Sequence, residues 1–231
     1  MNMRPSDECG ETKPKYNDVF KAFDLRKAQF SEPYNFPLYL ARNEIPRKLI
    51  PFNKIFQAKK EDFDAYVHFF LPDVCFECLW KNPNRYLTQL KKFSGCIAPD
   101  FSLCYDFPYP LQLYNCYRNR VLGYILSDNQ IPVITNVSFA DPRTYDFCCN
   151  GIQPGGVIAT GSLGSTKKRV NRALLKQGLH TILSKLTPSD LIIYGSIFSD
   201  LAEYCSEKGI KLHVFNPIWD SSFITKEVSN G

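Results

Sequence analysis

The sequence has little that would anchor it in a membrane. Its longest largely apolar segment, residues 65–71, spans about seven residues and includes His68, whereas a helix that crosses a bilayer needs about 20 apolar residues. Residues 1–16 contain Arg4, Lys13 and Lys15 but no apolar core of the kind that a secretory signal has. We therefore expect no membrane helix, no membrane partner and a cytoplasmic location.

Common catalytic and nucleotide-binding signatures are also missing. The patterns G-x-x-x-x-G-K-[ST], G-x-G-x-x-G, G-x-S-x-G and H-E-x-x-H do not occur. Their absence excludes the P-loop, the dinucleotide fingerprint, the nucleophile elbow of hydrolases and the zinc-protease helix. The three histidines, His68, His180 and His213, stand alone and form no pair with metal-ligand spacing. No cofactor is indicated.

The cysteines do not follow the pattern of a disulfide framework or a zinc ribbon. Nine cysteines, an odd number, are scattered along the chain, and without a signal sequence they indicate reduced thiols. Cys75 and Cys78 form the single C-x-x-C, but the next cysteines, Cys96 and Cys104, stand eight apart and make no second close pair. We predict buried thiols and no metal site, with a metal held by Cys75, Cys78 and distant partners as the alternative.

Composition indicates one folded domain with a modest excess of positive charge. The 231 residues are 44% hydrophobic and 14% aromatic, which is typical of a globular chain, and this length fits a single core. The formal net charge is +5 and the pI is near 8.6. A nucleic-acid-binding domain often exceeds a pI of about 9 with clustered Lys and Arg, so charge alone favours a polyanionic partner only slightly.

The chain divides into four segments. Residues 1–17 and 221–231 are polar and lack periodicity, which predicts a disordered N-terminus and a flexible tail. Residues 18–64 carry recurrent prolines among apolar residues, and because proline opposes helix interiors and central strands we predict an extended arm packed on the domain. Residues 65–220 are predicted to form a single α/β domain.

Within that domain short apolar runs alternate with longer helical periods. The predicted strands are residues 66–70, 95–98, 132–137, 157–160, 191–194 and 211–215, and the predicted helices are 83–93, 110–126, 167–186 and 201–208, with a short or irregular helix in 141–150. Apolar strands separated by helices are typical of right-handed βαβ units. We expect an α/β fold with a mostly parallel sheet of about six strands, as an open sheet or a partial barrel.

Polar and small residues follow the predicted strands. Because the carboxyl ends of parallel strands share one edge of a sheet, we expect these residues to form a site there. If chemistry occurs at this edge, Asp100 is the predicted acid or base, Tyr194 the proton donor and Ser102 a catalytic hydroxyl, while Asn136 is a predicted ligand contact. The alternative is that these residues are ordinary helix caps and turn formers.

The turn after residues 157–160 is the most informative stretch. This turn joins a predicted strand to a basic helix, and its residues of interest are Gly161, Ser162, Gly164, Ser165, Thr166 and Lys167. Backbone N–H groups and the positive end of a helix suit an oxyanion or a phosphate, so these residues are predicted ligand contacts, with a solvated basic turn as the alternative. Arg118 and Arg120 are further predicted ligand contacts, although residues two apart on a helix face different sides, and surface or ion-pair roles are the alternative.

An ordered set of short motifs resembles a known family. The motifs are Lys81-Asn82-Pro83, Pro99-Asp100-Phe101-Ser102, Tyr117-Arg118-Asn119-Arg120, Thr160-Gly161-Ser162-Leu163-Gly164, and Pro188 leading into Ile192-Ile193-Tyr194-Gly195. Over residues 62–200 the chain resembles a family of bacteriophage, prophage and plasmid proteins known as domain of unknown function 4417. The resemblance implies a mobile-element protein in a bacterial cytoplasm and supplies no mechanism.

These observations predict a phage or plasmid protein that recognises a phosphate-bearing ligand at the sheet edge. Nucleic acid or a nucleotide is the expected partner, since mobile elements mostly encode proteins that handle their nucleic acid. Two alternatives remain: a hydrolase or transferase acting on a small phosphorylated substrate, and a module that binds and disables a host protein. Whether the chain is an enzyme stays open at this point.

Overall fold

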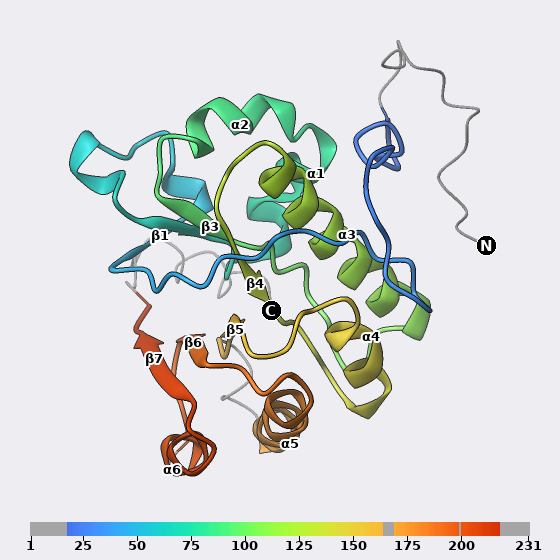
Figure 1. The fold of residues 1–231 in the computed structure, drawn as a ribbon, viewed down its shortest axis with the longest axis vertical. Coiled ribbons are helices and arrows are strands. Elements are labelled where there is room, and N and C mark those ends of the chain that lie inside the picture. The colour runs from blue at the N-terminus through green and yellow to red at the C-terminus, as the bar shows by residue number, and fades with distance from the viewer. Residues whose placement is uncertain (1–17, 164–168, 199, 218–231) are drawn as a thin grey trace, which may run out of the picture.

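The strands form one continuous parallel sheet. The computed structural model describes residues 18–163, 169–198 and 200–217 (Figure 1). The strands are β1 (Leu49–Pro51), β2 (Tyr66–His68), β3 (Gly95–Ile97), β4 (Val133–Asn136), β5 (Val157–Gly161), β6 (Asp190–Tyr194) and β7 (Lys211–Phe215). Their spatial order is the order of the sequence, and every neighbouring pair is parallel. The predicted α/β class with a mostly parallel sheet is confirmed.

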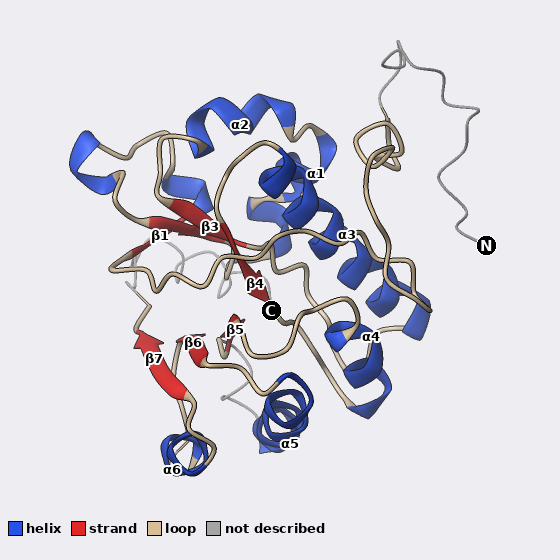
Figure 2. Cartoon of the chain, viewed as in Figure 1, coloured by secondary structure: helices blue, strands red, loops and turns tan. Residues whose placement is uncertain are grey.

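The α-helices of the described residues lie outside the curved sheet (Figure 2). They are α1 (Glu77–Lys81), α2 (Asn84–Leu90), α3 (Tyr109–Asp128), α4 (Tyr145–Cys149), α5 (Arg169–Leu186) and α6 (Leu201–Glu207), with short 3-10 turns at Phe52–Lys54, Lys60–Asp62, Asp73–Cys75 and Pro142–Thr144. When strand order follows chain order, right-handed crossovers place every helix on the same face. The sheet therefore curls into an open half-barrel with the helices on its convex side.

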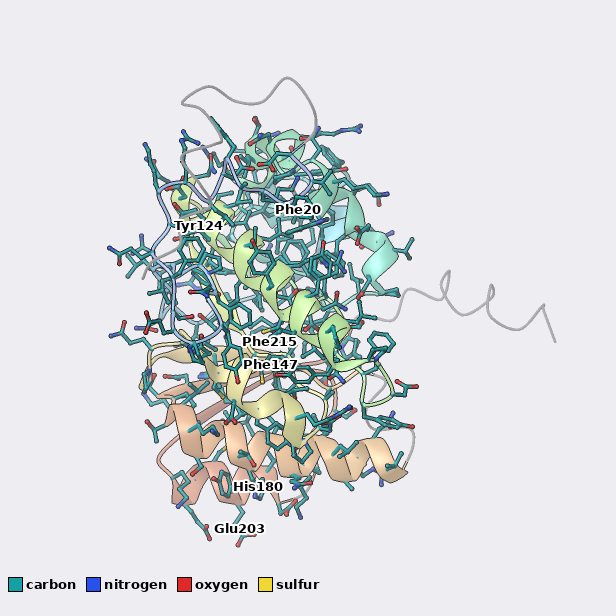
Figure 3. All side chains as sticks on the ribbon, turned by 90° about the vertical axis from the view of Figure 1, so that its right-hand side faces the viewer. Phe20, Tyr124, Phe147, His180, Glu203 and Phe215 are labelled. Atoms are coloured by element: carbon teal, nitrogen blue, oxygen red, sulfur yellow. The ribbon has the colours of Figure 1, made fainter. Side chains whose placement is uncertain are left out.

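Buried hydrophobic residues pack on both faces of this half-barrel. One convex cluster includes Phe69, Phe76 and Leu122, and a second includes the fully buried Phe147 and Leu179 (Figure 3). Alternate strand residues point to the concave face and form a third cluster. Its buried members are Tyr66, Phe70, Ile97, Ile134, Val157, Ala159, Ile192 and Tyr194.

The structure adds one strand to the six that were predicted. Leu49–Pro51 forms β1 and pairs with β2 at the edge of the sheet, in the segment predicted to be an extended arm. Three residues that end on a proline give almost no periodic signal, and proline is tolerated in an edge strand. α1 was also missed, because a single helical turn is too short to show a period of 3.6 residues.

Residues 38–46, ahead of β1, run across the domain in extended form, whereas much of 19–34 forms turns. The N–H of Arg42 donates to the carbonyl of Val133 at 2.7 Å, and Oδ1 of Asn43 accepts from the N–H of Val157 at 3.0 Å. This segment thus crosses the starts of β4 and β5. Within the described ranges, no helix is both long enough and apolar enough to traverse a bilayer.

Candidate functional site

Three strand ends meet around the carboxyl group of Asp100. Asp100 lies in the loop after β3. Its Oδ1 accepts a hydrogen bond from Nδ2 of Asn136, the last residue of β4, at 2.8 Å, and another from the hydroxyl of Ser138, just after β4. A Cβ atom placed on Gly161, the last residue of β5, would lie 3.5 Å from Oδ2 of Asp100. Gly161 is in turn paired with Tyr194, the last residue of β6. Four predicted site residues therefore share one edge, as expected.

The surroundings of Asp100 raise the pKa of its carboxyl group. Burial of the carboxyl group raises its pKa above the ordinary value, and the charge of Asp73 adds to the rise, while the hydrogen bonds from Ser138 and Asn136 oppose it. The residue keeps part of its surface exposed, although protein atoms surround the carboxyl. Asp100 is thus a carboxyl with one oxygen fixed by two donors and the other facing Gly161.

Asn136 carries hydrogen-bonding capacity that the described residues do not use. Its Nδ2 donates to the carbonyl of Pro99 at 3.2 Å, to Asp100 and to the hydroxyl of Ser138 at 3.0 Å. Its Oδ1 is buried and has no hydrogen-bond partner in the described part of the chain. A buried acceptor without a partner is unfavourable, so a donor from a ligand or a water would stabilise this cluster.

His68 is a residue of the concave face that the sequence analysis did not select as a site residue. It lies on β2, is 1% exposed, and its ring centroid is 4.2 Å from that of Tyr194. Its Nδ1 accepts from the N–H of Phe70 at 3.2 Å, which places the proton of the neutral ring on Nε2. Burial lowers the pKa of His68 to about 3. The only sequence signal for it was a lone histidine within an apolar strand.

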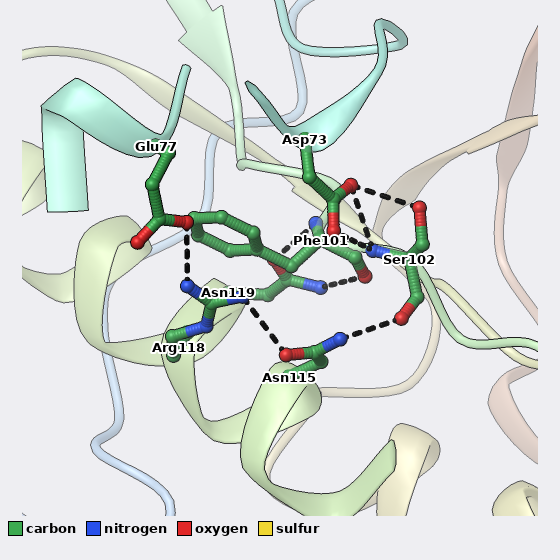
Figure 4. Close-up of polar contacts among 7 residues, drawn as sticks. All are labelled: Asp73, Glu77, Phe101, Ser102, Asn115, Arg118 and Asn119. Atoms are coloured by element: carbon green, nitrogen blue, oxygen red, sulfur yellow. Dashed lines mark hydrogen bonds and ion pairs between the residues drawn. The ribbon is translucent and has the colours of Figure 1, made fainter. Parts of the chain in front are cut away.

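Ser102 is held by an acidic residue that the sequence analysis did not select. Its hydroxyl donates to Oδ1 of Asp73 at 2.8 Å, and its N–H donates to both oxygens of the same carboxylate (Figure 4). The carbonyl of Ser102 accepts from Nδ2 of Asn115 at 2.7 Å. Ser102 therefore fixes the loop after β3 against the start of α3, and its catalytic role stays a prediction.

Arg118 belongs to the same supporting network. Its guanidinium pairs with Glu77 at 2.8 Å, donates to Oδ1 of Asn115 at 2.9 Å and lies 3.5 Å from the ring centroid of Phe101 (Figure 4). Asn119, one residue on, accepts from the N–H of Phe101 at 2.7 Å and donates to its carbonyl. Both side chains stabilise the loop that carries Asp100.

Arg120 faces another part of the molecule. Its Nη2 donates to the carbonyl of Cys148 at 2.6 Å, and no contact joins it to the Asp100 cluster among the described residues. The helical spacing of two residues had indicated that Arg118 and Arg120 would diverge, and they do. Neither arginine is brought to Asp100, and their roles in ligand binding stay predictions.

The turn after β5 is described only in part. The N–H of Ser162 donates to the carbonyl of Tyr194 at 3.0 Å, and its hydroxyl donates to the carbonyl of Ser196 at 2.7 Å. Ser162 is 2% exposed, so its side chain serves the turn. The predicted contacts Gly164, Ser165, Thr166 and Lys167 lie outside the described residues.

A small cavity adjoins this edge of the sheet. Its volume is about 220 Å³, and it is bounded by residues 103–106 after β3, by Phe139 and Ala140 after β4, and by Asn171, Leu174 and Leu175 of α5. Oδ1 of Asn171 is buried without a partner among the described residues. The loops after two strands and the first half of α5 thus enclose a space at the predicted end of the sheet.

The thiols and histidines show no metal cluster within the described ranges. Cys75 and Cys78 are half-buried, and no group of three or more metal-ligating side chains occurs in the described part of the chain. His213 instead contacts Asp190 at 2.7 Å.

Comparisons with known proteins give the chain a family and phage relatives. The model of a family described as "Domain of unknown function (DUF4417)" matches residues 28–211. The "Gene 1 protein" of Mycobacterium phage L5 is 32% identical over 205 residues, covering 88% of this chain and 82% of the relative. The "Gene 1 protein" of Mycobacterium phage D29 is 33% identical over 155 residues, covering 67% of this chain and 56% of the relative.

No solved structure matches the chain. The family match covers the strands β1 to β6 and the Asp100 cluster, and it extends past both limits of the region in which the sequence motifs occur. The chain therefore belongs to the family described as domain of unknown function 4417, whose relatives include proteins of mycobacteriophages.

Proposed function

We propose that this phage-related protein binds a phosphate-bearing ligand, a nucleotide or nucleic acid, at the carboxyl end of its parallel sheet. One observation carries the proposal: the ends of β3, β4 and β5 bring the carboxyl of Asp100, the amide of Asn136 and the backbone of Gly161 together. Ligands of α/β proteins bind at this edge because the loops after the strands converge there.

Charge also supports a phosphate at this edge. The sequence Lys167-Lys168-Arg169 follows the turn after β5, and α5 begins at Arg169. Cations at a helix start oppose the helix dipole, and an anion bound there would offset that repulsion.

The neighbouring side chains suit recognition of a base or sugar. Asn136 offers an unused buried oxygen, which can accept a hydrogen bond from an amino group of a base or a hydroxyl of a sugar. The phage relatives add context, since mobile elements mostly encode proteins that handle nucleic acid, although their printed names state no activity.

A second candidate is an enzyme that acts on a small phosphorylated substrate at the same edge. The specific observation in its favour is the environment of Asp100, a buried carboxyl with a raised pKa and one oxygen not fixed by a donor among the described residues. Such a carboxyl suits general acid or base catalysis. In this scheme Asp100 moves the proton, and Asn136 and Ser138 are positioning residues.

The test is a binding titration of the full chain. Fluorescence anisotropy would be measured with labelled single-stranded DNA, duplex DNA and RNA, and with labelled adenine and guanine nucleotides, between about 50 and 200 mM salt. We expect binding of at least one of these probes that weakens as salt rises. Lys167→Ala with Lys168→Ala should reduce both the affinity and the salt slope. The control is Lys91→Ala with Lys92→Ala, at an exposed pair after α2, which should bind as the wild type does.

The outcomes separate the candidates. No binding of any probe at low salt overturns the proposal. Binding that Asp100→Asn and the Lys167 and Lys168 variants leave unchanged would place the ligand elsewhere on the molecule and also overturn it. Turnover of a nucleotide that is lost in Asp100→Asn, while binding persists, would favour the enzyme.

A further inference from the structure

A second, larger cavity lies between the N-terminal segment and the outer face of the domain. Its volume is about 590 Å³, and its walls are residues 37–41 and Asn43 on one side and residues 150–157, which lead into β5, on the other. Because it adjoins residues that precede β5, it lies away from the strand ends that form the Asp100 cluster. Sites for small organic ligands have volumes in this range, roughly 300 to 1,000 Å³.

The N-terminal segment is fixed where it forms this wall. The hydroxyl of Tyr39 reaches Oγ1 of Thr135 on β4 at 3.5 Å, and Oδ1 of Asn43 accepts from the N–H of Val157. Nδ2 of Asn150 donates to the carbonyl of Glu32 at 2.6 Å on the opposite wall. Contacts from both walls hold the cavity in shape, so it is part of the folded structure.

Arg120 of α3 lines this cavity with its charge uncompensated. The residue is 5% exposed, and its guanidinium donates to the neutral carbonyl of Cys148 and interacts with the Cys116 thiol. No carboxylate of the described residues lies within ion-pair distance of it. Arg118, two residues earlier on the same helix, is paired with Glu77 at 2.8 Å, so the same helix shows both a compensated and an uncompensated buried arginine.

The thiols around Arg120 do not supply the missing negative charge. Burial raises the pKa of Cys116 to about 11 and raises that of Cys148 well above its ordinary value, so both are neutral at neutral pH. The pKa of Cys149 is lowered, first by a hydrogen bond with Cys148 and then by Arg120 and Lys185, but no hydrogen bond joins the Cys149 thiol to Arg120. A buried guanidinium without an anionic partner is unfavourable.

A bound anion would compensate Arg120. A guanidinium presents two parallel N–H donors that match the oxygens of a carboxylate or a phosphate. The remaining walls include Leu38, Ile152 and Pro154, which offer apolar surface to the organic part of a ligand. The geometry points to a binding site for a small organic anion, a phosphate monoester or a carboxylate, held by Arg120. This site is separate from the proposed phosphate site at the strand ends.

The test measures binding of named anions to the full chain. Isothermal titration and thermal unfolding would be followed with inorganic phosphate, phenyl phosphate and benzoate. We expect phenyl phosphate or benzoate to raise Tm and to bind more tightly than inorganic phosphate, since only these fill the apolar part. Whichever of phenyl phosphate and benzoate binds more tightly shows whether the site prefers a phosphate or a carboxylate group.

Variants locate the binding. Arg120→Met should weaken binding by about tenfold or more, since a hydrogen bond to a charged group is lost, while its Tm without ligand should be equal to or above that of the wild type. Ala41→Trp, which fills the cavity without altering Arg120, should also abolish binding. Arg47→Met, at an exposed arginine, is the matched control and should bind normally.

Three results would overturn the inference. One is the absence of any Tm change or heat of binding with all three anions. Another is binding that survives both Arg120→Met and Ala41→Trp. The third is a stronger response in Cys149→Ser than in the wild type, which would show that a Cys149 thiolate already compensates Arg120. Loss of nucleic-acid binding at the strand ends would not affect this site, so the two proposals fail separately.

Discussion

The rings of His68 on β2 and Tyr194 on β6 lie with their centroids 4.2 Å apart. Three strands separate β2 from β6 in the sheet, so these side chains meet because the sheet curls around its concave face. Phe70 completes the stack, its ring centroid 5.4 Å from that of Tyr194. The curvature buries His68 and links its protonation to the folded state.

His68 should make the protein sensitive to acid. Burial lowers its pKa from 6.5 to about 3 in the folded state, so the imidazole stays neutral there while the unfolded chain takes up a proton. Its contribution is complete above pH 6.5 and is lost as the pH falls toward about 3, by at most about 1.4 kcal/mol per pH unit. The free energy of unfolding in urea should therefore fall less on acidification in His68→Phe than in the wild type. The control is His180→Gln, at a half-buried histidine, whose free energy of unfolding should vary with pH as in the wild type. If His68→Phe also varies with pH as the wild type does, His68 is not the source of the acid sensitivity.

Asp100 should have the opposite pH dependence. Its pKa is raised in the folded state, chiefly by burial, so the folded protein binds the proton more tightly than the unfolded chain does. The resulting stability is present below the ordinary carboxyl pKa and is lost as the pH rises through the folded pKa. Asp100→Asn should thus gain stability relative to the wild type as the pH rises over that window, measured by urea unfolding. Glu203→Gln, at an exposed carboxylate of α6, serves as the control. A difference between wild type and Asp100→Asn that does not change with pH would argue against a raised pKa.

Asn119 should be a large contributor to the stability of the loop after β3. Asn119→Ala leaves the buried N–H and carbonyl of Phe101 without their partners, which costs about 2–6 kcal/mol for two unsatisfied groups. Urea unfolding would measure the loss. The matched control is Asn129→Ala at the end of the same helix, where one bond from a half-buried amide to the carbonyl of Ile125 is removed, with a loss below about 1.5 kcal/mol. Similar losses in the two variants would show that Asn119 does not hold this loop.

Gly123 should determine how tightly the N-terminal segment packs on α3. In an exposed helix, replacing glycine by alanine stabilises by up to about 1 kcal/mol. Here the new Cβ would lie 2.7 Å from Cε1 and 2.9 Å from Cζ of Tyr39, so the Tyr39 ring must move. Gly123→Ala should therefore increase the rate of limited proteolysis within residues 37–43. The double variant with Tyr39→Leu restores space and should lower that rate again; unchanged proteolysis in Gly123→Ala would show that the segment adapts without loosening.

The predicted strands illustrate which parts of the fold were accessible from the chain alone. Residues 157–160 and 191–194 are apolar runs bounded by turn residues, and they became β5 and β6 with nearly the same limits. β1 was missed because it has three residues, and its position is set by pairing with β2. Short edge elements depend on contacts with distant residues, which no local pattern records.

The candidate site shows the same division. The sequence placed Asp100, Asn136, Gly161 and Tyr194 at one edge because parallel strands share an end, and the structure places them there. It did not select Asp73, which accepts two donors from Ser102. Asp73 and Ser102 are 29 residues apart in the chain, so no short sequence motif indicates that they form hydrogen bonds.

The sequence by itself determined the α/β class, the parallel strands, the shared strand-end edge and the family, since each depends on local periodicity, chain order or short motifs. Tertiary structure alone decided that His68 meets Tyr194, that Arg118 is paired while Arg120 faces a cavity, and which oxygen of Asp100 is fixed. The reason is physical: sheet curvature and side-chain partners result from packing between residues far apart in the chain, and a period read along the backbone carries no information about those distances.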